Sequence, residues 1–398
     1  MKLITNPQKI EETLTQRVKQ VLPTKKGLKE LMKKRKIKLY LGIDPTGKKL
    51  HLGHTIALRK LEEFANLGHE VILLVGTGTV LAGDPSERDK ARPKITEKEI
   101  KENMKTWKKQ AQKIIDFSKV KIKYNGDWLL KLKLEDIINI ASQISAVKLF
   151  QRDMFKKRLQ KKDTVWMHET LYPLLQGYDS VAMDVDLEIG GTDQTFNMLI
   201  GRELLQKMKK KEKFVLITPM ILGIDGRQMS KTSGNCIWLT DSAPEMFGKI
   251  MSIPDKLIIP YFELLTNLSF SLIKKYKKNL VKKKINPRDL KKKLALEIVK
   301  MYHPQKATKE AQEEFSRVFE EKRAPSKMPE VKILKKELNI LELLMKTKLA
   351  SSKSEAKRLI LQKAIKIDGL PESDWKKTIR IQKGMILQVG KRKFVTIK

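Results

Sequence analysis

Residues 38–75 restrict the fold of this chain more than any other stretch, because they combine two apolar strands with a helix between them. Residues 38–43 are typical of a short strand, and residues 55–67 place their apolar side chains on one helical face. Residues 71–75 are apolar throughout, which is typical of a strand buried on both faces of a parallel sheet. The stretch therefore predicts one βαβ unit, and a ligand is expected at the carboxyl ends of its strands.

The alternation of strands and helices continues up to residue 217. Further strands are predicted at 119–124, 185–189 and 214–217, and helices at 11–21, 27–34, 95–117, 134–158, 169–178 and 197–208. Strands that alternate with helices over so long a stretch predict an α/β fold with a doubly wound, Rossmann-like parallel sheet.

From residue 243 onward the strand signals stop and helices are predicted at 244–251, 258–266, 271–280, 287–302 and 308–320. Residues 323–330 contain two prolines and have the composition of a linker. A small α+β module follows, with helices at 338–346 and 354–362 and strands at 365–367, 379–381, 385–389 and 394–397. The predicted division is an α/β domain over 1–240 with an insertion at about 120–165, an α-helical domain over 241–322, a linker over 323–336 and the small module over 337–398.

Length and composition limit the classes of protein to which the chain can belong. No apolar run reaches the roughly 18 residues of a membrane span, and residues 1–8 lack the apolar stretch of a signal peptide. A single cysteine, Cys236, excludes an intrachain disulfide and a cysteine-based zinc site, so a reducing, cytoplasmic location is expected. The net charge of +38 favours a polyanionic partner, although a lysine-rich composition accounts for part of this charge.

Two loops carry the side chains with the clearest chemical meaning. His51 and His54 stand at the start of the helix that follows the first strand, where the amides of the first turn favour an anion. Between them, Gly53 leaves room for a planar base against the backbone. The second loop, residues 226–234, is flanked by glycines and contains one lysine, Lys231, so it suits a phosphate chain. Each loop alone also has a structural explanation, because histidines cap helices and polar loops are common.

Together the two loops resemble the signature motifs of class I aminoacyl-tRNA synthetases. The segment from Asp44-Pro-Thr46 to His51-Leu-Gly-His54 resembles the HIGH signature, and Gln228-Met-Ser-Lys-Thr232 resembles the KMSKS signature. Four further segments resemble tyrosyl-tRNA synthetases in particular: residues 40–46, residues 83–86, Tyr172-x3-Gln176-x2-Asp179 and Gly190-Gly-Thr-Asp-Gln194. The resemblance covers essentially the whole chain and implies a tyrosine–tRNA ligase.

An enzyme of this family activates L-tyrosine with ATP to tyrosyl-adenylate, releases pyrophosphate, and transfers tyrosine to the 3′-terminal adenosine of tRNA(Tyr). Tyr40 and Asp179 match the positions that hydrogen-bond the phenol hydroxyl of tyrosine. Asp84, Tyr172 and Gln176 match those that hold its α-ammonium group. Phenylalanine would leave the buried polar pair at the phenol end unsatisfied, which is how this family is known to reject it.

The resemblance also implies how ATP is bound. The positions around the ribose, the α-phosphate and the carboxyl group are matched by Gly42, Asp44, Gly191, Asp193 and Gln194. The groups that stabilise the spread negative charge of the transition state are matched by Thr46, His51, His54 and Lys231. Further ATP contacts are implied for Gly53, Gln228, Met229 and Ser230. ATP would enter as a substrate with Mg²⁺, and no tightly bound metal is expected.

One departure from the family pattern lies in the second signature. Gln228 replaces its first lysine, and Thr232 replaces its final serine. We expect a weaker hold on pyrophosphate, by one charge-assisted contact of about 1.5–3 kcal/mol, unless the neighbouring Arg227 compensates.

The last part of the chain is similar to the ribosomal-protein-S-four-type RNA-binding domain at residues 348–360 and 364–369. Residues 338–398 contain 15 Lys or Arg and 5 Asp or Glu, a net charge of +10 that suits contacts to RNA phosphates. The helices of residues 243–320 are expected to bind the anticodon region of tRNA(Tyr). The apolar stripe at residues 137–150 is either core or a dimer face, and the resemblance implies a homodimer.

Three alternatives remain. Tryptophanyl-tRNA synthetases share the fold and both signatures, but Tyr40, Asp179 and the C-terminal module argue against that reaction. A non-catalytic RNA-binding protein on a synthetase scaffold is supported only by Gln228. A nucleotidyltransferase with an HxGH loop would need neither the helical part nor the C-terminal module.

Overall fold

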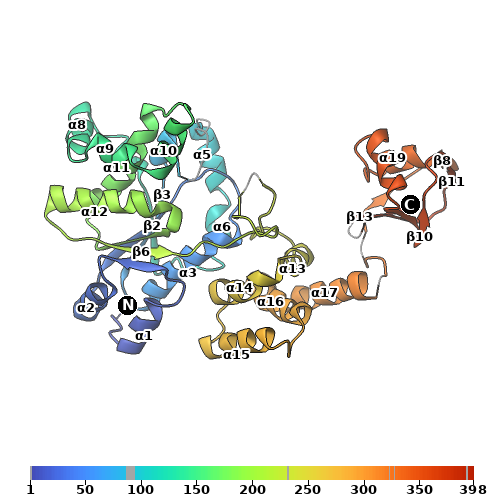
Figure 1. Ribbon diagram of the computed structural model, residues 1–398, viewed down its shortest axis with the longest axis horizontal. Helices are drawn as coiled ribbons and strands as arrows, with labels where there is room; N and C mark the ends of the chain where they lie inside the picture. The colour runs from blue at the N-terminus through green and yellow to red at the C-terminus, as the bar shows by residue number, and fades with distance from the viewer. Residues whose placement is uncertain (1, 87–94, 231–232, 322, 327, 391–392) are drawn as a thin grey trace. The chain divides into compact units, whose positions relative to one another are not determined.

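The computed structural model describes residues 2–86, 95–230, 233–321, 323–326, 328–390 and 393–398 (Figure 1). The chain divides into two compact units, Met1–Tyr302 and His303–Lys398. The predicted helical domain begins within the first unit and ends within the second, so its boundaries stay a prediction. No helix in the described part of the chain has the length and apolar character needed to cross a membrane.

The first unit is built on a six-stranded sheet with the order β1-β6-β5-β2-β3-β4. Its strands are β1 (Gln20–Leu22), β2 (Lys38–Ile43), β3 (Glu70–Val75), β4 (Val120–Tyr124), β5 (Leu187–Gly191) and β6 (Phe214–Thr218). The five strands from β2 to β6 pair in parallel, and β1 is antiparallel to β6 at the edge. The doubly wound parallel sheet predicted from the sequence is confirmed, with one antiparallel edge strand added.

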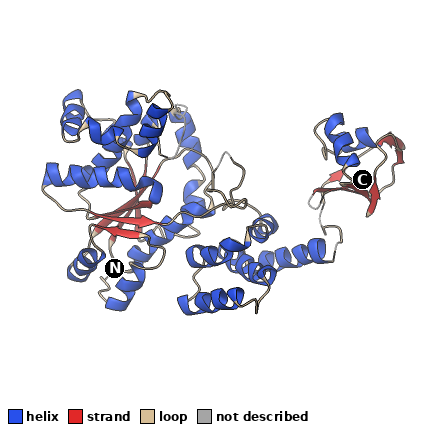
Figure 2. Cartoon of the chain, viewed as in Figure 1, coloured by secondary structure: helices blue, strands red, loops and turns tan. Residues whose placement is uncertain are grey.

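The helices of the first unit lie on both faces of this sheet and beyond it (Figure 2). They are α1 (Pro7–Thr13), α2 (Lys25–Lys34), α3 (Leu52–Asn66), α4 (Thr79–Ala82), α5 (Glu97–Met104), α6 (Trp107–Ala111), α7 (Gly126–Leu129), α8 (Leu134–Ser142), α9 (Ala146–Phe150), α10 (Asp153–Gln160), α11 (Met167–Met183), η1 (Thr192–Gln194), α12 (Thr195–Lys209), α13 (Ala243–Met251), η2 (Asp255–Leu257), α14 (Ile258–Leu265), α15 (Phe270–Val281) and α16 (Pro287–Tyr302).

The order of the strands determines where a ligand can bind. The crossover β2–α3–β3 moves toward one edge of the sheet, whereas β5–α12–β6 moves toward the other. Because parallel crossovers are right-handed, α3 and α12 must cover opposite faces. The two connections therefore diverge between β2 and β5, and a crevice opens at the carboxyl ends of these strands.

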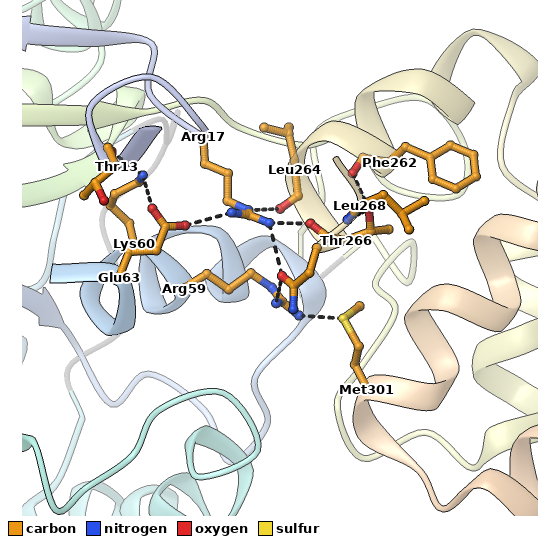
Figure 3. Close-up of polar contacts among 11 residues, drawn as sticks. Thr13, Arg17, Arg59, Lys60, Glu63, Phe262, Leu264, Thr266, Leu268 and Met301 are labelled. Atoms are coloured by element: carbon orange, nitrogen blue, oxygen red, sulfur yellow. Dashed lines mark hydrogen bonds and ion pairs between the residues drawn. The ribbon is translucent and has the colours of Figure 1, made fainter. Parts of the chain in front are cut away.

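Helix α3 also contacts the helical part of the first unit through buried polar side chains (Figure 3). Arg17 donates to Glu63 of α3 (Nη1–Oε1, 2.7 Å) and to the carbonyl oxygen of Leu264 (3.0 Å). Arg59, one turn earlier on α3, donates to the side-chain oxygen of Asn267 at 3.0 Å. These bonds join α3 to residues 264–267, so they hold the helix that begins at the histidine loop against the helices that follow the sheet.

Several predicted helices are wrong in their extent. The helix predicted at 11–21 ends at Thr13, because Arg17 takes a positive φ of 55° and sends its side chain to other elements. The helix predicted at 134–158 is divided into α8, α9 and α10, and Arg152 at the start of α10 is buried and donates to Ser86. The helix predicted at 95–117 is likewise divided into α5 and α6. Contacts distant in sequence override helix propensity at these breaks.

The second unit begins with α17 (Gln305–Phe315) and the π-helical turn η3 (Ser316–Glu320). Its other elements are β7 (Glu330–Val331), β8 (Glu337–Asn339), α18 (Ile340–Lys346), α19 (Lys353–Leu361), β9 (Ile365–Ile367), β10 (Leu370–Glu372), β11 (Thr378–Arg380), β12 (Ile386–Val389) and β13 (Lys393–Ile397). The main sheet has the order β10-β9-β12-β13-β7 and shares an apolar core with α18 and α19. Strands β7, β8 and β10 were not predicted, and β7 lies within the predicted linker, because two- and three-residue strands give little periodic signal.

The buried lysine of α3 gives a first prediction. Lys60 is fully buried, donates to the carbonyl oxygen of Thr13 and pairs with Glu63. Burial lowers its pKa from 10.5 to about 8, against the opposing effect of Glu63. The unfolded chain therefore holds this proton up to higher pH than the folded chain, so stability rises as pH increases from 8 to 10.5. Lys60→Met should lose this rise, which amounts to about 2–3 kcal/mol by pH 10.

The measurement is the free energy of unfolding in urea at pH 7 and pH 10, compared between the variant and the wild type. Lys101→Met, which removes a surface lysine paired with Glu97, is the matched control and should follow the wild type. An equal change from pH 7 to pH 10 in Lys60→Met and wild type would contradict the assignment.

Candidate active site

A cavity of about 370 Å³ opens at the divergence between β2 and β5. It is lined by seventeen of the eighteen residues predicted for the site: Tyr40, Gly42, Asp44, Thr46, His51, Gly53, His54, Asp84, Tyr172, Gln176, Asp179, Gly191, Asp193, Gln194, Gln228, Met229 and Ser230. The eighteenth, Lys231, lies outside the described residues. Residues from both signature loops and from the segments between them thus surround a single cavity.

The histidine loop forms the N-terminus of α3. The backbone N–H of His51 donates to Nδ1 of His54 at 3.1 Å, and the two ring centroids are 3.8 Å apart. A Cβ on Gly53 would lie 2.9 Å from Nδ1 of His51, so only glycine allows this packing. The two rings and the first turn of the helix lie together at the cavity, and a helix N-terminus attracts an anion.

Side chains from α5 and α6 hold the loop that precedes α3. Asn103 donates to the carbonyl oxygen of Pro45, and the indole N–H of Trp107 donates to that of Gly47, both at 2.8 Å. This is also why the predicted single helix over 95–117 is broken: its two halves bend around the loop. The loop is therefore positioned before any ligand arrives.

The deep end of the cavity lies between β2, β4 and α11. Tyr40 forms a hydrogen bond with Ser180 (Oη–Oγ, 2.9 Å), and its burial raises the pKa of the phenol well above 10. Asp179, one residue earlier than Ser180, accepts from the side-chain amide of Asn125 (3.0 Å) and from the indole N–H of Trp128 (2.8 Å). Burial raises the pKa of Asp179 well above its usual range, against the opposing effect of these two donors.

A second group of acceptors lies nearer the strand ends. Asp44 accepts from the hydroxyl groups of Tyr172 (2.9 Å) and Thr79 (2.8 Å). Asp84 accepts from the amide of Gln194 at 2.9 Å and from the hydroxyl group of Ser86. The cavity therefore has carboxylates distributed along its length, each already oriented by neutral donors.

Some residues of the site were not predicted. Asn125 and Trp128 follow β4, and Trp128 belongs to the short helix α7. Their position after a strand of the parallel sheet was the available signal, because such strand ends border the ligand crevice. Ser180 gave no signal, since one serine on a helix is unremarkable.

The second signature loop is held by Asn235. Its side-chain oxygen accepts from the backbone N–H of Ser230 (2.9 Å), and its amide donates to the carbonyl oxygen of Gln228 (2.9 Å). Arg227 pairs with Asp225 at 2.8 Å and is largely exposed, so its guanidinium does not face the cavity. The compensation that Arg227 could provide for Gln228 is not seen in this arrangement.

The fold and the two loops define a class I tRNA synthetase. Residues 32–320 match the family described as tRNA synthetases class I (W and Y), and residues 320–397 match the tyrosine–tRNA ligase SYY-like C-terminal domain. The chain is 43% identical to the tyrosine–tRNA ligase of Thermotoga maritima over 392 residues, covering 98% of both chains. It is 40% identical to that of Moorella thermoacetica, covering 97% of this chain and 92% of the relative. The chain belongs to the tyrosine–tRNA ligase family.

Solved structures share the fold. A C-terminally truncated mitochondrial tyrosyl-tRNA synthetase of Aspergillus nidulans has a TM-score of 0.65 at 21% identity, covering 79% of this chain and 94% of the other. The Archaeoglobus fulgidus tyrosyl-tRNA synthetase complexed with L-tyrosine has a TM-score of 0.63 at 20% identity, covering 77% and 100%. The tryptophanyl alternative is not favoured, because the full-length relatives and the C-terminal match are tyrosine–tRNA ligases.

The donors around Asp179 give a second prediction. Trp128→Phe removes the indole N–H that stabilises the carboxylate, so the pKa of Asp179 should rise further. If the ionised carboxylate binds tyrosine, the acidic limb of kcat/KM for tyrosine should move to higher pH. Glu188 and Asp44 lie close enough to raise the same pKa and are unchanged in the variant.

The measurement is ATP–pyrophosphate exchange between pH 5.5 and 9. Trp166→Phe, at an exposed tryptophan outside the cavity, is the control and should keep the wild-type limb. An unchanged limb in Trp128→Phe would show that Asp179 does not control tyrosine binding.

Proposed function

We propose that this cavity activates L-tyrosine with ATP, giving tyrosyl-adenylate and pyrophosphate, and then passes tyrosine to the 3′-terminal adenosine of tRNA(Tyr). The observation that carries the proposal is the presence of buried polar groups at both ends of a single cavity next to a helix N-terminus. One end can bind a phenol hydroxyl, the other an α-ammonium group, and the helix start an anion.

The phenol of tyrosine would bind at the deep end. Its hydroxyl would donate to Asp179 and pair with Tyr40, which burial keeps protonated at neutral pH. Phenylalanine would leave these groups without a partner in a site that excludes water, and the penalty for that is much larger than the loss of one favourable contact.

The α-ammonium group would bind where Asp84, Tyr172 and Gln176 line the cavity. Its carboxylate would then point toward the start of α3, where the α-phosphate of ATP must also lie for the attack. The carboxylate is already ionised at neutral pH, so the first step needs no general base. Positioning and charge stabilisation supply the catalysis.

ATP would lie along the strand ends and the two signature loops. The absence of side chains at Gly42, Gly53 and Gly191 allows the nucleotide to approach the backbone, and Asp193 with Gln194 would contact the ribose or the α-phosphate. Thr46, His51, His54 and Lys231 would stabilise the charge on the phosphates. We propose that Mg²⁺ arrives on the phosphates of ATP, because this ion is usually bound through substrate phosphates and water rather than by a cage of protein ligands.

The replacement of lysine by Gln228 would weaken the grip on pyrophosphate. Gln228 lines the cavity, but its amide cannot supply a charge-assisted bond. This difference would affect the rate of the first step rather than the identity of the substrate, because Gln228 belongs to the loop proposed to bind the phosphates.

We propose that the rest of the chain binds tRNA(Tyr) in the cytoplasm. The helices that follow the sheet would contact the anticodon region, and residues 338–398, with a net charge of +10, would contact RNA phosphates. In this module the ammonium group of Lys357 lies 4.0 Å from the ring centroid of Trp375, a pairing that places a cation beside an aromatic face.

A homodimer is proposed from the apolar surface of the insertion. Leu134, Ile138 and Val147 are 73%, 60% and 66% exposed, which is unusual for aliphatic side chains so close together in sequence. Beside them, Leu130 and Ile137 line an apolar hollow of about 210 Å³. A second copy of the chain would cover this surface in an isologous interface.

Ile138→Glu should therefore convert the dimer into a monomer, because it would bury an unpaired carboxylate in the interface. Sedimentation velocity of the purified chain measures the change. Leu361→Glu, at another exposed aliphatic residue, is the control and should remain dimeric. A wild-type chain that sediments as a monomer would overturn the proposed dimer.

The direct test of the proposed function is ATP–pyrophosphate exchange with tyrosine, phenylalanine and tryptophan, on the wild type and on Asp179→Ala. Exchange should occur with tyrosine alone and fall by at least about 100-fold in the variant, since the phenol loses its buried acceptor. Asp127→Ala, next to the same wall but outside the cavity lining, is the matched control and should keep its activity.

Exchange with tryptophan would instead favour the tryptophanyl-tRNA synthetase alternative. No exchange with any of the three amino acids, in a folded protein that binds tRNA, would favour the non-catalytic RNA-binding protein.

A further inference from the structure

A buried ion pair lies directly behind the wall of the cavity. Glu188 of β5 and Lys213, which immediately precedes β6, are separated by 2.5 Å between Oε2 and Nζ. Their side chains are 2% and 0% exposed, and neither residue lines the cavity. An ion pair so fully removed from water is weak evidence for a role in stability, because its desolvation cost rivals the attraction between the charges.

Each member of the pair makes one contact toward the cavity. The other carboxylate oxygen of Glu188 accepts from the side-chain amide of Gln176 (Oε1–Nε2, 3.1 Å). The ammonium group of Lys213 donates to Ser180 at 2.8 Å, and Ser180 in turn bonds to Tyr40 at 2.9 Å. The ion pair is thus connected to both ends of the proposed tyrosine site.

The contact with Gln176 determines which way its amide faces. A carboxylate can only accept hydrogen bonds, so Glu188 must face the NH2 group of Gln176. The amide oxygen of Gln176 is then directed away from Glu188, and it is buried with no hydrogen-bond partner in the described structure. Gln176 lines the cavity, so this oxygen is an acceptor available to a ligand that can donate.

The packing of α11 against α12 makes room for the pair. A Cβ on Gly201 of α12 would lie 2.6 Å from Nζ of Lys213 and 3.0 Å from Oγ of Ser180. Gly177 of α11 faces Gly201 with an equally close backbone approach, because a Cβ there would lie 3.1 Å from the Gly201 nitrogen. Gly201 therefore leaves the space in which the ammonium group lies, and Gly177 allows the two helices to approach closely there.

We propose that Glu188, held in place by its ion pair with Lys213, is a positioning residue that fixes the amide of Gln176 with its oxygen toward the α-ammonium group of tyrosine. This inference rests on the proposed function of the cavity. Neither charged residue touches the substrate, and the effect reaches it only through the orientation of one amide group.

In the variant Glu188→Gln, we expect the amide of Gln176 to reverse its orientation. The ammonium group of Lys213 can only donate, so it would attract the oxygen of the new amide and leave the NH2 group facing Gln176. Gln176 would then turn its own oxygen to that NH2 group. It would present an NH2 group to the α-ammonium group of tyrosine, and two donors facing one another repel.

Removing the cation as well should restore binding. In Glu188→Gln/Lys213→Met no ammonium group determines the orientation of the new side-chain amide. The oxygen of this amide can therefore face the NH2 group of Gln176, as the carboxylate does in the wild type. A residue with only a structural role would not show this rescue, since the double variant departs further from the native packing than the single variant.

The experiment measures the affinity of the full chain for two ligands by isothermal titration calorimetry. Tyrosinol retains the ammonium group, and 3-(4-hydroxyphenyl)propionate lacks it. Glu188→Gln should weaken tyrosinol by about tenfold or more and change the propionate by less than about twofold. The double variant should bind tyrosinol within about threefold of the wild type.

Glu169→Gln is the matched control, because Glu169 is another buried carboxylate, paired with Arg158 at 2.7 Å outside the cavity. It should leave the ratio of the two affinities unchanged. If Glu188→Gln weakens both ligands equally, or neither, the positioning role is overturned. A wild-type chain that fails to bind tyrosinol overturns the function proposed for the cavity instead.

If Glu188→Gln does not fold, Glu188→Leu/Lys213→Met replaces it. This variant has no buried charge and no group to orient Gln176, so it should still lose tyrosinol affinity relative to the propionate. An unchanged ratio in this variant would also overturn the proposal.

Discussion

The divergence of the chain between β2 and β5 is the constraint on which the rest of the structure depends. Right-handed crossovers that move toward opposite edges of the sheet cannot cover the same crevice, so the strand ends of β2 and β5 stay accessible. The start of α3 and the turn after β5 then meet at this crevice, although they lie far apart in sequence. The topology thus brings residues from distant parts of the sequence to the lining of one cavity.

In the crevice and directly behind its wall, polar groups must stay buried and correctly oriented before a ligand arrives. Asp179 is held by Asn125 and Trp128, Asp84 by Gln194, and Glu188 by a cation. These neighbouring donors fix the orientation of each carboxylate without taking the place of a ligand. Burial raises the pKa of Asp179, and its donors limit this rise. In the proposed function, the selectivity of the deep end would therefore depend on residues that do not touch tyrosine themselves.

The parallel sheet could be predicted because residues 71–75 and 38–43 carry the apolar pattern of buried strands. The residues that line the cavity were predicted from the resemblance of short ordered motifs to tyrosyl-tRNA synthetases. The sequence did not predict the break near Arg17, where a side chain distant in sequence decides the backbone, or the roles of Asn125 and Ser180. Such residues act through contacts that only the fold creates. The pairing of Glu188 with Lys213 belongs to the same class, since neither residue forms part of a motif.

The most direct measurement is a crystal structure of the full chain with L-tyrosine bound. We expect the phenol oxygen to lie about 3 Å from both the Asp179 carboxylate and the Tyr40 hydroxyl. We also expect the α-ammonium nitrogen to lie about 3 Å from Asp84 and from the amide oxygen of Gln176. An amino acid bound in the reverse direction, or one whose ammonium group lies away from Gln176, would contradict this expectation.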